Sequence, residues 1–234
     1  MCSHYQAVKN NAQFERQFGL PPTAVAQPAD VWPGYLGSFI RPHPHADAGD
    51  EAVPALEAAS GVFGLLPHWA KDRTLGRHTY NARCETVAEK PSFRDAWARS
   101  QHCIIPADAF FEPDWRSGRA VATRIAMANG APMGIAGLWS AWRSPQGEVL
   151  SFTMLTVNAD AHPLMRHFHK PGDEKRMVVV LPPDFYAKWL QAGPAHSMDL
   201  IYACPAPELV AQADSPPAGL RAAKPSAAQQ ATLF

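Results

Sequence analysis

The segment from Met133 to Leu181 contains three apolar stretches, MGIAGLW at 133–139, SFTMLTV at 151–157 and MVVVL at 177–181. Each stretch is short and rich in β-branched or aromatic residues, which is typical of β-strands. The last stretch is continuously apolar, as in a strand that is buried on both faces. On the N-terminal side of this segment, further strands are predicted at 38–40, 61–66, 103–105, 110–112 and 121–127. The sequence therefore predicts a strand-rich fold.

Helix signals are fewer, because 23 prolines and 15 glycines break the chain into short pieces. A helix is expected from Asn11 to Phe18. Ser92 could cap a second helix that runs to Arg99, and Pro183 with Asp184 could open a third helix through Leu190.

Two segments lie outside the predicted core. The polar stretch RPHPHADAGDE at 41–51 is expected to be an exposed loop, and residues 215–234, rich in Ala, Pro, Gln and Ser, a flexible tail. We therefore expect a single domain over residues 2–214. With 47% hydrophobic and 18% charged residues, this domain has the composition of a soluble globular protein.

Several functional classes are disfavoured by composition. No apolar run approaches the roughly 18 residues that a membrane span needs, and the N-terminus lacks the apolar stretch of a signal peptide. We therefore expect a cytoplasmic protein without membrane contact. A formal net charge of zero argues against nucleic-acid binding through bulk charge, although the stretches 71–99 and 166–176 are locally basic. The four cysteines are widely spaced, which predicts free thiols.

Cys2 follows the initiator methionine, and removal of Met1 would give one residue both a free α-amine and a thiol. The reference pKa values of these groups are about 8 and about 8.5, so near neutral pH both are partly nucleophilic. Such an aminothiol can condense with an aldehyde to an imine and then close a thiazolidine ring. Alternatively, the thiol could attack an acyl group with the amine as its base.

Other polar residues stand in contexts that suggest a site. Within Tyr80–Thr86, Asn81 could orient a substrate oxygen and Arg83 could bind a phosphate, although a turn held by side chains would explain the same residues. Glu112 follows two aromatics, and apolar surroundings would raise the pKa of its carboxyl into the range of a general acid. Trp69, beside basic residues such as Lys71, could stack a base of a single strand or pack in the core.

Three histidines, His162, His167 and His169, fall within eight residues. No carboxylate or cysteine accompanies them at convincing ligand spacing, so an acid, base or hydrogen-bonding role is favoured over a metal site. The sequence indicates neither a metal nor a cofactor.

The order of these motifs resembles the SOS response-associated peptidase (SRAP) family. The resemblance covers most of residues 2–190 and is carried by six pieces in order: Met1-Cys2, Gly64 to Lys71, Asn81 to Thr86, Phe110 to Glu112, Ala136 to Trp139, and His169 ahead of Arg176-Met177. It implies an α+β fold with a strand-rich mixed sheet, a barrel-like core and a few peripheral helices.

The resemblance also implies a function and a set of residue roles. Family members bind single-stranded DNA and trap abasic sites as a thiazolidine on the terminal cysteine, and the peptidase name reflects proposed self-removal of preceding residues. For this chain, Cys2 would be the nucleophile, Asn81 would position the sugar or amine, Glu112 would transfer protons and His169 would orient the opened sugar. Single-stranded DNA with abasic sites is the expected partner, bound by a monomer.

Carried over in the same way, Arg83 would hold a phosphate, Trp69 would cover a base, and Lys71 and His4 would contact DNA. The chain departs from the family where Ser3 and His4 replace the usual Gly-Arg. It also departs where the six residues 170–175 separate His169 from Arg176-Met177, which keeps His167 open as an alternative.

Two other functions fit the N-terminal cysteine. An N-terminal-nucleophile amidohydrolase acting on a small amide would need an oxyanion-hole Asn-Gly, and the sequence offers only Asn129-Gly130, which is predicted to form a hairpin turn. A binding module with a buried or acylated Cys2 would not respond to blocking of the terminus.

Overall fold

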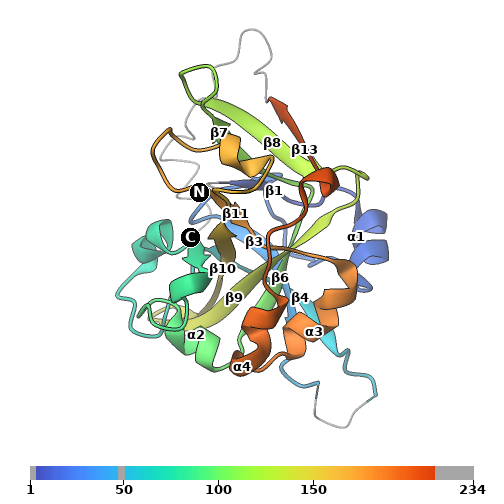
Figure 1. Cartoon of the computed structure of the whole chain (residues 1–234). Helices are drawn as coiled ribbons and strands as arrows, with labels where there is room; N and C mark the ends of the chain where they lie inside the picture. The colour runs from blue at the N-terminus through green and yellow to red at the C-terminus, as the bar shows by residue number, and fades with distance from the viewer. Residues whose placement is uncertain (1–3, 47–50, 214–234) are drawn as a thin grey trace.

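The computed structural model describes residues 4–46 and 51–213, and Figure 1 shows how their strands and helices are arranged. The helices are α1 (Asn11–Phe18), α2 (Arg94–Ala98), α3 (Tyr186–Gln191) and α4 (Pro194–Ser197). The strands are β1 (Tyr5–Gln6), β2 (Asp30–Val31), β3 (Leu36–Pro42), β4 (Leu56–Phe63), β5 (Asn81–Arg83), β6 (His102–Ala107), β7 (Ala109–Asp114), β8 (Val121–Met127), β9 (Met133–Ser144), β10 (Gly147–Asn158), β11 (Arg176–Val178), β12 (Val180–Leu181) and β13 (Leu209–Ala213).

A closed barrel of β4, β3, β6, β9 and β10 forms the centre of the molecule. It closes because β10 pairs with β9 along one edge and in parallel with β4 along the other. Strands β5 and β11 also pair with β10, and β12 pairs with β9. The expectation of a strand-rich mixed sheet with a barrel-like core is confirmed.

A second sheet, in the order β13-β8-β7-β1-β2, lies above the barrel in Figure 1. Its inner side chains, among them Tyr5 and Phe110, join the barrel residues Phe39, Phe63 and Phe152 in one buried cluster. Ring centroids of Tyr5 and Phe63 lie 5.4 Å apart, edge to face, which is a favourable arrangement for aromatic pairs. This cluster fixes β7 against the barrel.

The helices cover the outside of the barrel (Figure 1). Helix α1 has the predicted bounds, because the side chain of Asn10 caps its first turn and Gly19 ends it with a left-handed φ of 75°. The expected cap at Ser92 is wrong, since α2 begins at Arg94 without a side-chain cap. The third predicted helix begins as a single 3₁₀ turn at Pro183 and becomes α-helical from Tyr186.

Several expectations about strands and loops need correction. The loop expected at 41–51 is wrong at its start, because Arg41 and Pro42 belong to β3 and Arg41 pairs with Glu57 at 2.7 Å. The strand expected at 61–66 ends at Phe63, and the run 177–181 is divided at Val179 between β11 and β12. Residues 47–50 and the tail from 215 lie outside the described residues. Among the described residues, no helix has the length and apolar character to cross a membrane.

Candidate functional site

Glu112 is a buried carboxyl in β7, the strand that runs beside β1. Its residue is only 2% exposed, since Phe110 and Phe111 precede it and the strand faces the core between the two sheets. Burial raises the pKa of the Glu112 carboxyl to about 8. The raised pKa expected from the two preceding aromatics is therefore found, and the group is mainly protonated near neutral pH.

His169 lies against this carboxyl, with 3.3 Å between its Nδ1 and Glu112 Oε2. The residue has a φ of 66°, unusual for a side chain other than glycine, and its amide donates to the carbonyl of Pro113 at 2.9 Å. On the other side of the ring, Nε2 is 2.8 Å from the carbonyl oxygen of Arg176. These two hydrogen bonds hold His169 in its strained conformation, in which the imidazole ring faces Glu112.

These contacts determine where the protons reside. A carbonyl oxygen can only accept, so Nε2 of His169 carries a proton and donates it to Arg176. Burial lowers the pKa of His169, which keeps the ring neutral and leaves Nδ1 as an acceptor. The Glu112 carboxyl, with its pKa of about 8, is mainly protonated near neutral pH, so the pair is a neutral acid facing a neutral base.

Arg176 connects this pair to the segment that follows Asn81. Its guanidinium is buried and donates to both carboxylate oxygens of Glu85, at 3.0 and 2.8 Å, and to Glu174 at 2.7 Å. It also donates to the carbonyl of Thr156 at 2.7 Å. Although partial burial opposes it, hydrogen bonds from Arg176 lower the pKa of Glu85. The network fixes the carbonyl that orients His169.

Asn81 begins β5, which pairs in parallel with β10 opposite Met154, and its side chain is partly buried. Arg83 ends the same strand and is half exposed, with its Nη1 2.7 Å from Oε2 of Glu174. The residue predicted to bind phosphate therefore has an internal carboxylate partner. β5 and β11 pair with opposite edges of β10, and the Arg176 network links the 81–85 segment across β10 to β11.

The predicted DNA-binding residues are distributed over the surface. Trp69 is 46% exposed and Lys71 is exposed, both in the segment between β4 and β5. The ring of His4 is stacked between two aromatic rings, and its carbonyl accepts from the amide of Phe111 at 3.2 Å. Cys2, the predicted nucleophile, lies outside the described residues.

His162 and the described cysteines make contacts that stabilise the fold. His162 Nε2 donates to the carbonyl of Cys204 at 2.7 Å, while Nδ1 accepts from the amides of Leu164 and Met165. Within residues 4–46 and 51–213, no group of three His, Cys, Asp or Glu side chains is arranged to hold a metal. Cys84, Cys103 and Cys204 are free, as the cysteine spacing predicted, and all three are buried. Burial raises the pKa of Cys84 and of Cys204 to about 12, which makes both thiols poor nucleophiles.

Sequence reasoning missed the roles of Glu85, Glu174 and Thr156 around Arg176. Of these three residues, only Glu85 could have been predicted from the sequence, because it lies in the same motif as Asn81 and Arg83. Glu174 lies in the insertion at 170–175, where no motif predicted a partner.

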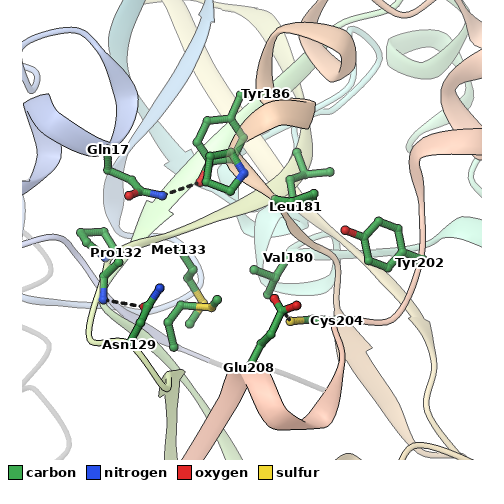
Figure 2. A pocket seen from close by; sticks show the side chains of 14 residues that line it. Gln17, Asn129, Pro132, Met133, Val180, Leu181, Tyr186, Tyr202, Cys204 and Glu208 are labelled. Atoms are coloured by element: carbon green, nitrogen blue, oxygen red, sulfur yellow. Dashed lines mark hydrogen bonds between the residues drawn. The ribbon is translucent and has the colours of Figure 1, made fainter.

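A pocket of about 170 Å³ lies elsewhere, between β12, α3 and the segment before β13 (Figure 2). Residues on its wall include Gln17, Asn129, Tyr186, Cys204 and Glu208, and none of the predicted catalytic residues.

Asn129 and Gly130 form a turn, but the hairpin expected there is wrong. Strands β8 and β9, which the turn joins, belong to different sheets.

Comparison with known proteins gives consistent matches. The family model described as "SOS response associated peptidase (SRAP)" matches residues 1–213. The chain is 37% identical over 131 residues to "Abasic site processing protein YoaM" of Bacillus subtilis, covering 55% of this chain and 54% of that one. It is 23% identical over 177 residues to "Abasic site processing protein HMCES" of Xenopus tropicalis, covering 67% and 50%. The chain thus spans about half the length of these curated relatives.

A solved structure is similar over nearly the whole chain. The crystal structure of a protein from Bordetella bronchiseptica has a TM-score of 0.82 and 46% sequence identity, covering 92% of this chain and 100% of that one. The barrel and its second sheet are therefore a shared architecture.

Proposed function

Because this chain belongs to the SOS response-associated peptidase family, we propose that it processes abasic sites in DNA by trapping them covalently on Cys2. The relatives that it matches are named abasic site processing proteins. The observation that carries the proposal is the buried, protonated Glu112 held against neutral His169, which is an acid suited to carbonyl chemistry near neutral pH.

The proposed reaction consumes one aldehyde and releases one water. The abasic sugar opens when its ring oxygen takes a proton and its C1′ hydroxyl gives one up, so that the bond from C1′ to the ring oxygen breaks and the aldehyde is exposed at C1′. The α-amine of Cys2 adds to this carbon, and loss of water with a proton from an acid gives an imine. The thiol then adds to the imine carbon, a C–S bond forms and the nitrogen takes the remaining proton. The product is a thiazolidine.

Each residue has a proposed part in this sequence. Glu112 supplies and recovers the protons in ring opening and ring closure. His169 accepts a hydrogen bond from the acid and orients the opened sugar. Asn81 positions the sugar or the amine through its amide, while Trp69 and Lys71 contact the single strand. Arg83 would join them at a phosphate once it is released from Glu174.

Chain geometry is compatible with the placement of Cys2 near the acid. His4 is hydrogen-bonded to Phe111, the residue before Glu112. Two residues of extended chain span at most about 7 Å, so Cys2 cannot lie far from His4. The proposal requires the amine and thiol of Cys2 to reach Glu112, and it requires removal of Met1, by self-processing or by another peptidase.

A denaturing gel tests this proposal. The Met1-processed protein is incubated with single-stranded DNA that contains one abasic site, and a band shifted by the mass of the protein is expected. The band should be absent for Cys2→Ser and for DNA without the lesion. Cys204→Ser is the matched control, because that thiol is buried and its pKa is about 12. An unchanged band with Cys2→Ser would refute the proposal.

A further inference from the structure

Three aromatic rings form a column across the second sheet. The ring centroids of Phe111 and His4 are 4.0 Å apart at an interplanar angle of 13°, and those of His4 and Trp32 are 4.0 Å apart at 10°. The register explains the column, because Tyr5 is opposite Phe110 in β7 and opposite Val31 in β2. The strands are antiparallel, so His4, which precedes Tyr5, is opposite the residues that follow Phe110 and Val31. These residues are Phe111 and Trp32, and the His4 ring lies between their rings.

Exposure increases along this column. Phe111 is 5% exposed, whereas Trp32 is 42% exposed, which is unusual for so large an apolar side chain. Trp32 follows β2, which is the edge strand of its sheet. Among the described residues, His4 is the only ring stacked on Trp32. The column therefore begins at Phe111, the residue before Glu112 in β7, and ends in an accessible aromatic surface.

We propose that the outer face of Trp32 stacks a nucleobase of the bound single strand, close to the lesion. This inference rests on the proposed function, which supplies the strand. Near-parallel rings at 4.0 Å already have the arrangement of stacked bases, and a base would continue the column by one more ring. Because neighbouring strands lie about 4.8 Å apart, the Cα of Trp32 is about 10 Å from that of Phe111.

The column also gives His4 a specific part. Its imidazole is enclosed between two rings, so it supports the indole of Trp32 and does not reach outward as the longer arginine of the family pattern could. We therefore assign His4 to positioning of the stacking surface. Binding through a flat aromatic face tolerates any base, because every base has a π-face.

The test uses intact single-stranded DNA that carries a fluorescent aminopurine base, and abasic DNA that carries the same base at positions flanking the lesion. Binding by the wild type should quench the aminopurine. Trp32→Leu should remove the quenching and weaken binding about five- to 150-fold, as expected for loss of one base–aromatic stack. Trp32→Phe should restore most of both effects. Tyr202→Leu is the matched control, since Tyr202 is a similarly exposed aromatic beside the pocket of Figure 2.

The outcomes separate this inference from the proposed function. If the wild type crosslinks abasic DNA but Trp32→Leu binds as tightly as Tyr202→Leu, the stacking surface is refuted and the crosslinking proposal stands. If the wild type binds and quenches intact DNA without crosslinking abasic DNA, the stacking surface stands alone. Equal unfolding midpoints for the Leu and Phe variants exclude a folding defect, and no quenching at any flanking position refutes the inference.

Discussion

Glu112 and His169 form a neutral pair in which the carboxyl is protonated and the imidazole is neutral. Two pKa shifts support this assignment, because burial raises the pKa of Glu112 and lowers the pKa of His169. The carbonyl of Arg176 fixes the tautomer by accepting from Nε2. The pair can therefore donate a proton near neutral pH without first separating charge.

The rate of crosslinking should depend on pH through this carboxyl. Since Glu112 loses its proton at about pH 8, the rate should fall above that pH even though the Cys2 thiol becomes more nucleophilic. Glu112→Gln cannot transfer a proton and should be about 100-fold slower or more. Initial rates from quenched gels over a pH series give the profile.

Glu148→Gln is the control for this experiment, because Glu148 is an exposed residue of β10. Its profile should coincide with that of the wild type. A wild-type rate that continues to rise well above pH 8 would contradict the assigned proton donor.

Stability should also depend on pH through Glu112, and the sign follows from linkage. The folded-state pKa of about 8 is above the ordinary value of 4.5 for a glutamate carboxyl, so the folded protein binds more protons than the unfolded chain between these values. The free energy of unfolding should therefore fall as pH rises from 4.5 to 8, with a loss on the order of a few kcal/mol. Urea titrations should show a smaller slope with pH for Glu112→Gln, and parallel curves would contradict the buried acid.

In the segment between His169 and β11, Glu174 forms an ion pair with Arg83. Replacing Glu174 with Gln should release Arg83 for a phosphate, so DNA binding should tighten. The slope of log affinity against log salt should steepen by about 0.7, the value for one phosphate contact on a single strand. Arg176 keeps its two bonds to Glu85, which limits the loss of stability.

Asp173→Asn is the matched control for Glu174→Gln, because it removes the same charge from the same loop, one residue away. Among the described residues, the ion-pair partner of Arg83 is Glu174 and not Asp173. Fluorescence anisotropy with intact single-stranded DNA at several salt concentrations measures both variants. Equal changes in DNA affinity and salt slope for the two variants would mean that the lost negative charge of the loop, and not the release of Arg83, changes the affinity.

Elements with strong local signals could be predicted from the sequence. Helix α1 has a capping Asn10 and a terminal Gly19, and β8 has a long β-branched pattern, so their bounds were correct. The two-residue strands β1 and β2 have too little local sequence pattern, since β1 exists through pairing with β7 and β2 through pairing with β1. Ser92 has the chemistry of a cap, but the helix starts two residues later.

Closure of the barrel requires a glycine at position 137. A Cβ there would collide with the side chain of Ile105 and the carbonyl of Thr153, where β9 lies between β6 and β10. Gly137→Ala should lower the free energy of unfolding by about 3 kcal/mol, because two neighbouring strands would have to move apart.

Gly193→Ala is the control, since its Cβ would meet no atom within 4 Å. It should cost less than about 1 kcal/mol. Urea unfolding measures both variants, and equal stabilities would contradict a closed barrel at this seam.

For the whole molecule, the sequence identified the family motifs but not the interactions that connect them. Glu112 and His169 were named from motif order, and they lie together in the structure. Their link to the Asn81 segment runs through Arg176 and Glu85, residues 91 positions apart in the chain. Such a contact depends on how β5 and β11 both pair with β10, which no local pattern encodes.

The central claim is that the amine and thiol of Cys2 together bind one aldehyde carbon. The most direct measurement is the mass of the N-terminal peptide from the crosslinked protein, digested after treatment with iodoacetamide. The account predicts a peptide that begins at Cys2, carries the sugar remnant less one water, and has no alkylation at sulfur because the ring blocks it. A peptide that retains Met1, an alkylated Cys2 in the adduct, or a crosslink on another residue would contradict the account.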